Sequence, residues 1–131
     1  MENKRKHLEI IQTTINRMAN CSFLIKGWCI TIVSALLALT IKETNNRLIF
    51  ITIIPIVIFW ILDGFFLFQE RLYRALYDEV RMKADEQIDF SMNTLKFLGE
   101  RNRWVKAMFS KTLNILYLSL VLLVSIFLFI M

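Results

Sequence analysis

Residues 48–68 read LIFITIIPIVIFWILDGFFLF, a run in which only Asp63 carries a charge. A helix needs about 20 apolar residues to cross the hydrocarbon core of a bilayer, and this run has that length. Two further runs match it in length and character, residues 20–41 and residues 112–131. The sequence therefore predicts three transmembrane helices.

The composition excludes most other classes of protein. Of the 131 residues, 56% are hydrophobic, and the mean hydropathy is +0.53. Three glycines and one proline are too few for a turn-rich β architecture or a low-complexity chain. Cys21 and Cys29 lie too far apart along one helix to bridge, so we expect two reduced, buried thiols. We expect one all-α membrane domain over residues 1–131.

The placement of the basic residues predicts the orientation. The chain has 16 Lys and Arg against 11 Asp and Glu. Most of the basic residues lie in residues 1–26 and 69–111, whereas the connection 42–47 carries only Lys42 and Arg47. The positive-inside rule then places the N-terminus and residues 69–111 in the cytoplasm, with the short connection and the C-terminus outside. No cleavage site follows residues 20–41, so we expect that span to be retained.

Residues 1–19 are predicted to form a cytoplasmic amphipathic helix. Its apolar side chains recur at steps of three and four, which is one stripe of a helix: Leu8, Ile11, Ile15 and Met18. Such a stripe can lie on the membrane surface or dock on another cytoplasmic helix, and we favour docking.

The first span, residues 20–41, has one face of small and mildly polar side chains. At 100° per residue this face gathers Gly27, Thr31, Ser34, Ala35 and Ala38. Small residues let another helix approach closely, and hydroxyl groups supply hydrogen bonds between helices. The same face could line a narrow aqueous pore. Both interpretations remain open at this point.

The carboxylate in the second span needs a partner, because a charge at that depth costs about 2.5–3.5 kcal/mol on insertion scales. If the chain turns near Asn45, Lys26 and Asp63 lie at nearly the same depth on two antiparallel helices. One interpretation is an ion pair that locks the two helices together. The other is a direct role of Asp63 in ion passage or gating.

Residues 69–111 are predicted to form a long cytoplasmic helical hairpin. The apolar stripe of the second span continues to about residue 98, and residues 99–102 fit a helix end and turn. A returning helix then begins near Arg103 and runs into the third span, with Trp104, Lys106 and Lys111 as anchors at the membrane interface. The third span, residues 112–131, is the natural lipid-facing helix.

Three helices offer little interior for a polar face, so we expect a homo-oligomer that closes into a ring. Along a straight second helix, Glu70, Arg74 and Arg81 return to nearly the direction of Asp63. If that direction is the ring axis, the arginines form cationic girdles that bind phosphates. The alternative is an exposed stripe of pairs such as Glu70 with Arg74, each worth about 0.3–0.5 kcal/mol.

Enzymatic motifs are absent from the sequence. His7 is the only histidine, and no glycine-rich phosphate loop or activated nucleophile occurs. We therefore expect no catalytic residues, no metal site and no cofactor.

The chain resembles a family of short bacterial membrane proteins in anti-phage defence loci, in particular the membrane effectors of Hailong systems. Two stretches carry the resemblance, INRMANCSFLIKGWCITIVSALLAL at 15–39 and PIVIFWILDGFFLFQERLYRALYDEVR at 55–81. It implies a homo-oligomeric ion channel of the bacterial inner membrane, for which a tetramer is one candidate. A single-stranded oligodeoxyadenylate, made by a partner nucleotidyltransferase, would hold the channel shut, and its loss during infection would open the channel and depolarise the cell.

Carried onto this sequence, the resemblance makes Asp63, Lys26 and the small-residue face candidate channel elements. Arg71, Arg74 and Arg81 become candidate phosphate contacts, and Tyr77 a candidate for base stacking. The competing hypothesis is a non-conducting membrane scaffold that docks a cytoplasmic partner through residues 69–111.

Overall fold

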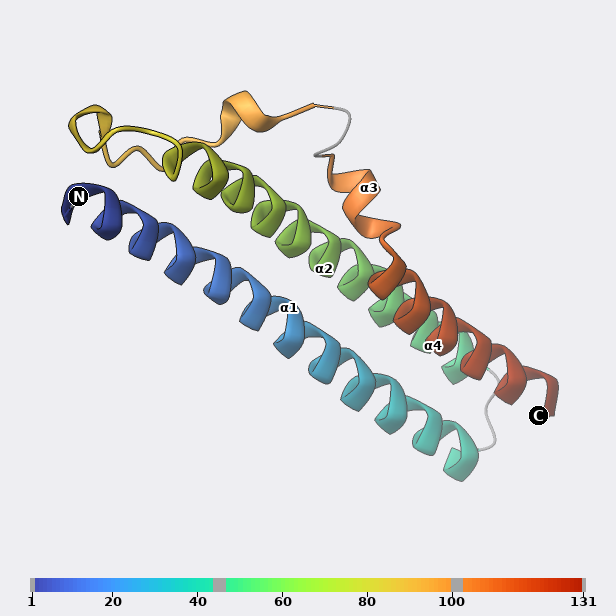
Figure 1. Ribbon diagram of the computed structural model, residues 1–131. Coiled ribbons are helices and arrows are strands. Elements are labelled where there is room, and N and C mark those ends of the chain that lie inside the picture. Colours follow the sequence, from blue (N-terminus) through green and yellow to red (C-terminus); the bar gives the residue numbers. More distant parts are fainter. Residues whose placement is uncertain (1, 44–46, 100–102, 131) are drawn as a thin grey trace.

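The computed structural model describes residues 2–43, 47–99 and 103–130, and in these ranges the fold is all-α (Figure 1). Two long helices come first, α1 (Glu2–Glu43) and α2 (Arg47–Val80). Two short 3-10 turns follow, η1 (Asp85–Gln87) and η2 (Leu95–Phe97). The chain returns through the short helix α3 (Trp104–Met108) to the last helix, α4 (Lys111–Ile130).

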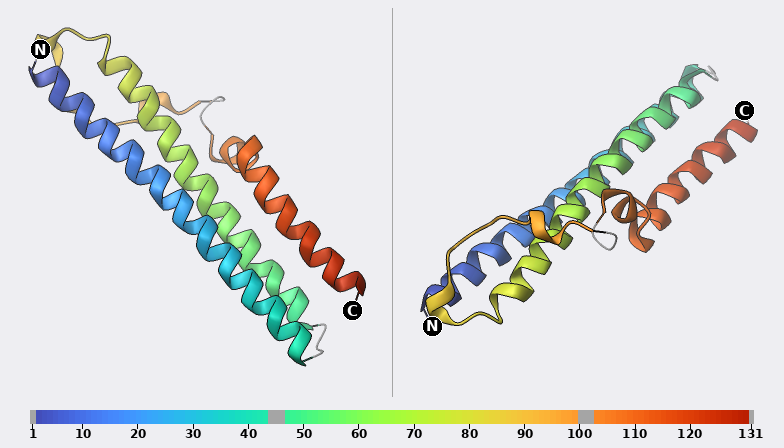
Figure 2. Two further views of the ribbon diagram at one scale, coloured as in Figure 1. Left: turned by 60° about the horizontal axis from the view of Figure 1, so that its bottom comes forward. Right: turned by 90° about the horizontal axis from the view of Figure 1, so that it is seen from above.

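The helices α1, α2 and α4 run side by side, and α2 lies between the other two over much of its length (Figure 2). Each of these three helices is long and apolar enough to span a membrane. Their shared interior is a cluster of apolar side chains from all three helices, including Cys29, Val33, Ile56 and Leu113. The prediction of three apolar helices of membrane-spanning length is therefore confirmed.

The predicted N-terminal helix is the first part of α1 and is continuous with the first span. Its apolar stripe docks on α2 as we favoured. Ile11 and Ile15 are buried in a second cluster together with Leu76 and Val80 near the end of α2. The paired helices therefore extend well beyond the three-helix region, which gives the molecule an elongated shape (Figure 2).

The prediction of a long helical hairpin over residues 69–111 is confirmed only in part: the helix of the second span continues through residues 69–80, but the rest of the hairpin is wrong. Helix α2 ends at Val80, and residues 81–99, which we call the strap, are mostly not helical. Within the strap the backbone amides of Ser91, Asn93 and Leu95 each bond a side chain two residues earlier, on Asp89, Ser91 and Asn93. Such local bonds offer the backbone an alternative to a helix, and the apolar periodicity did not reveal them.

The returning segment begins where the sequence predicts, since Arg103 precedes the first residue of α3. It does not run unbroken into the third span, because the helix is interrupted at Phe109 and Ser110. Two indole N–H groups tie α3 to α2: Trp60 donates to the carbonyl oxygen of Met108 at 2.6 Å, and Trp104 to that of Ile61 at 3.1 Å. Of the turn predicted at residues 99–102, residues 100–102 lie outside the described ranges.

Candidate functional site

The carboxylate of Asp63 lies between α1, α2 and α4 with no exposed surface. The Lys26 ammonium lies 2.6 Å from its Oδ2 atom, and the Tyr117 hydroxyl donates to the same oxygen at 2.9 Å. The Ser22 hydroxyl donates to Oδ1. All three helices therefore contribute to one polar network, formed by Ser22, Lys26, Asp63 and Tyr117.

Lys26 completes this network and keeps partial access to its surroundings. Its ammonium also donates to the Ser22 hydroxyl at 2.7 Å, and its side chain remains 21% exposed. A long lysine side chain can bury its alkyl part and keep its charged end near the membrane surface. The predicted ion pair of Lys26 with Asp63 is therefore confirmed, whereas a role in gating stays a prediction.

Sequence reasoning missed the other two members of the network. Ser22 lies one helical turn before Lys26, a spacing that places both side chains on one face of α1. Tyr117 is the only tyrosine in the third span, where a buried hydroxyl normally needs a polar partner. Its ring also stacks on Trp60, with ring centroids 5.7 Å apart. Both features can be read from the sequence, but neither identifies Asp63 as the partner without the arrangement of the helices in space.

The small-residue face of α1 points away from the interior formed by α1, α2 and α4. All five of its members are exposed: Gly27, Thr31, Ser34, Ala35 and Ala38. Thr31 bonds the carbonyl oxygen of Gly27, whereas the Ser34 hydroxyl has no hydrogen-bond partner in the described parts of the chain. Helix α1 packs against the other helices through a different face, on which Cys29 is fully buried as predicted. Cys21 is only half-buried, so the prediction that it is buried is partly wrong.

The arginines predicted to bind phosphate do not form one cluster. Arg74, on α2, and Arg81, the first residue of the strap, are both exposed, and they pair with Glu70 at 2.8 Å and with Asp78 at 3.6 Å. Arg71 is half-buried and lines a separate cavity beside the spans. The hypothesis that Asp63 and these arginines face a common ring axis is not supported. Asp63 instead faces α1 and α4 of the same chain.

Tyr77 is less exposed than a side chain that stacks on a nucleic acid base needs to be. Its side chain is half-buried and packs against the cluster of Ile11, Ile15, Leu76 and Val80. The buried part of the Tyr77 ring therefore contributes to the packing of α1 against α2.

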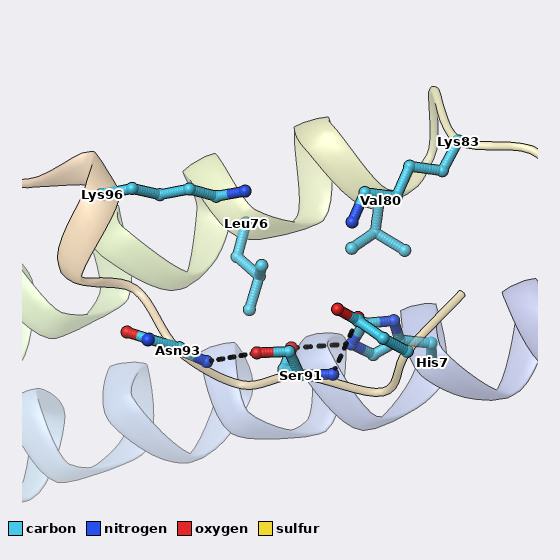
Figure 3. A pocket seen from close by; sticks show the side chains of 8 residues that line it. His7, Leu76, Val80, Lys83, Ser91, Asn93 and Lys96 are labelled. Atoms are coloured by element: carbon cyan, nitrogen blue, oxygen red, sulfur yellow. Dashed lines mark hydrogen bonds between the residues drawn. The ribbon is translucent and has the colours of Figure 1, made fainter. Parts of the chain in front are cut away.

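A small cavity of about 150 Å³ lies under the strap, between the first turns of α1 and the end of α2 (Figure 3). His7 is buried there and bonds the carbonyl oxygen of Ser91 at 3.0 Å through Nε2, while its Nδ1 has no partner in the described residues. Lys83 and Lys96 approach from the opposite side, and Glu79 pairs with both. His7 has no role in the sequence-based prediction, and in the structure its hydrogen bond to Ser91 holds the strap on α1.

Comparison with known proteins finds no matching family model, no matching curated protein and no matching solved structure.

Proposed function

We propose that the chain is the subunit of a homo-oligomeric ion channel, with the small-residue face of α1 turned toward the shared axis. The observation that carries this proposal is the exposure of all five small residues on a span-length helix. Small side chains at a helix surface favour close approach of another helix. A ring of identical subunits brings this face together around one axis.

Two features of the subunit support this arrangement. The Ser34 hydroxyl has no partner among the described residues, and a second subunit or pore water would supply one. The polar network around Asp63 already joins α1, α2 and α4 inside one subunit. The subunit can therefore assemble as a preformed unit, with the carboxylate as an internal lock.

The resemblance to defence effectors extends the proposal to regulation. An oligodeoxyadenylate, made by a nucleotidyltransferase partner, would bind at the cytoplasmic end of α2 and hold the channel closed. Arg74, on α2, and Arg81, which directly follows its last residue, support this step because both side chains are 59% exposed. Loss of the ligand during infection would open the channel and depolarise the inner membrane.

The orientation in this proposal follows the positive-inside rule, with the N-terminus in the cytoplasm and the C-terminus outside. The docked part of α1, the end of α2 and the strap then form one cytoplasmic unit. A bound ligand on this unit can bias the spans directly, because α1 and α2 continue from it into the membrane without a break.

One observation favours the alternative of a non-conducting scaffold. The strap exposes large apolar side chains, with Met82 81% and Leu95 70% exposed. Exposed apolar side chains of this kind can form part of a docking surface for a cytoplasmic protein.

Ionic flux through purified protein in liposomes tests the two functions against each other. We expect flux that added oligodeoxyadenylate suppresses, and we expect the Arg74→Ala, Arg81→Ala double variant to conduct without suppression. The matched control is Arg103→Ala, Lys106→Ala, which removes two exposed positive charges elsewhere. Absence of flux from folded, oligomeric protein under every condition would contradict the channel and leave the scaffold.

A further inference from the structure

A second cavity opens where α1, α2 and the start of α4 meet, with a volume of about 380 Å³. Each of the three helices contributes a basic side chain to its lining: Lys26 from α1, Arg71 from α2 and Lys111 from α4. Hydroxyl groups of Ser110 and Thr112 lie in the same lining. The cavity therefore combines three positive charges with hydrogen-bond donors.

Two of these positive charges are not compensated by the protein. Lys26 pairs with Asp63, and Glu70, the acidic residue of the lining, pairs with Arg74. Arg71 and Lys111 have no ion pair or hydrogen bond in the described parts of the chain. An anion in the cavity would therefore meet two cationic side chains that are free to bind it.

The cavity lies at the edge of the apolar spans. Arg71 follows the apolar run 48–68 by three residues, and Lys111 immediately precedes the run 112–131. Leu67 and Leu113 belong to the same lining and lie on the membrane side of these two residues. A ligand here would have its anionic part beside the basic side chains and its apolar part beside the spans, which is the shape of an amphiphile.

We propose that this cavity binds the phosphate of an anionic phospholipid from the adjoining membrane leaflet. Arg71 can hold phosphate oxygens through two parallel N–H groups, and Lys111 adds a compact positive charge. Basic pockets between membrane helices are suited to such head groups. This inference does not require that ions pass through the protein.

The position of the cavity favours a lipid over an oligonucleotide. Arg74 lies farther along α2 and Arg81 directly follows its last residue, so both lie farther from the apolar run, and both are more exposed than Arg71. A nucleic acid strand would approach those exposed side chains from the aqueous phase. The cavity of Arg71 adjoins apolar side chains that a lipid acyl chain can cover and a nucleic acid cannot.

The test measures binding and stability of the full-length protein in phosphatidylcholine nanodiscs with increasing phosphatidylglycerol. The variant Arg71→Gln, Lys111→Gln removes the two free charges, and Arg103→Gln, Lys106→Gln is the control with the same change in net charge. Each variant is first compared in pure phosphatidylcholine by circular dichroism, so that misfolding is seen separately. Inorganic phosphate and oligodeoxyadenylate are added in parallel arms.

We expect phosphatidylglycerol to raise the melting temperature of the wild-type and control proteins. Loss of each cation should weaken lipid binding roughly fivefold, and loss of both about thirtyfold. Single variants Arg71→Gln and Lys111→Gln keep the test valid if the double variant does not fold. No effect of phosphatidylglycerol, or equal losses in cavity and control variants, would overturn the proposal. An equal effect of inorganic phosphate or of the oligonucleotide through Arg71 and Lys111 would overturn the lipid assignment.

Discussion

At the residue scale, Asp63 is the position at which the three long helices depend on one another. Its two carboxylate oxygens accept bonds from Ser22, Lys26 and Tyr117, so none of its charge is left unpaired in the interior. A buried charge of this kind is tolerated because its partners are satisfied together. Removal of one of these side chains should therefore lower the free energy of unfolding by more than the ion pair itself contributes, because its partners are left unpaired in the interior.

We expect Asp63→Leu to lower the free energy of unfolding by about 1–3 kcal/mol, because Lys26 and Tyr117 lose their acceptor. Helicity during unfolding by sodium dodecyl sulfate in micelles measures this loss. Adding Lys26→Leu should recover part of it, since no charge then remains unpaired. A double variant less stable than Asp63→Leu would contradict the ion-pair account.

Asp63→Asn separates the structural role from a role in conduction. The amide keeps the shape and can still accept the bond from Tyr117. Since Asp63 faces the interior of its own subunit, we expect unchanged flux per assembled channel in liposomes. Loss of flux from an intact oligomer would show that Asp63 takes part in ion passage or gating.

Gly64 sets the distance between α2 and α3. A Cβ atom at this position would lie 3.1 Å from the Cα atom of Met108, and it would also overlap the Met108 side chain. We expect Gly64→Ala to lower the melting temperature, because the backbone of α3 would have to move. Gly99→Ala is the control, since its Cβ meets nothing within 4 Å and Gly99 lies outside the small-residue face of α1. Equal stability of Gly64→Ala and Gly99→Ala would contradict the close contact.

At the element scale, the parts that follow from helical periodicity were predictable from the sequence. The three spans, the docking stripe around Ile11 and Ile15, and the pairing of Lys26 with Asp63 all follow from positions on a regular helix. The strap does not, because its apolar spacing fits a helix while its Asp, Ser and Asn side chains bond the local backbone. Contacts such as His7 with Ser91 depend on the fold of the strap and have no sequence signal.

Hydrogen exchange tests the boundary between α2 and the strap. The amides at the end of α2, up to Val80, lie in a helix that packs on α1 and should exchange slowly. The amides of residues 86–98 should exchange faster, since few of them bond the backbone of a regular element. Mass spectrometry of the full-length protein in micelles measures both segments. Slow exchange of all amides up to residue 98 would contradict the strap and would support a long helical hairpin over residues 69–111.

At the scale of the whole molecule, the folded chain leaves a face of α1 that its own helices do not cover. The sequence predicted which residues share this face, but neither sequence nor subunit gives the number of copies, which depends on contacts between chains. A larger side chain on this face leaves the interior of the subunit unchanged and acts only on contacts outside it.

We expect Ala35→Leu to reduce the size of the oligomer without lowering the stability of the subunit. The added side chain prevents close approach of a second helix, because small residues at such an interface allow contact of the backbones. Native mass spectrometry from micelles gives the oligomer size. Leu118→Ile, at an exposed position on α4, is the control. An unchanged oligomer in Ala35→Leu would place the interface elsewhere.

The central claim is that this face of α1 lines the ion path, and modification of Ser34→Cys tests it most directly. The background carries Cys21→Ser and Cys29→Ser, so the new thiol is the only one in the chain. Flux into liposomes is measured before and after a charged methanethiosulfonate reagent, with Leu118→Cys on α4 as the control. We predict that the reagent alters flux through Ser34→Cys and leaves Leu118→Cys unchanged. Flux that the reagent leaves unchanged in a labelled Ser34→Cys channel would contradict the account.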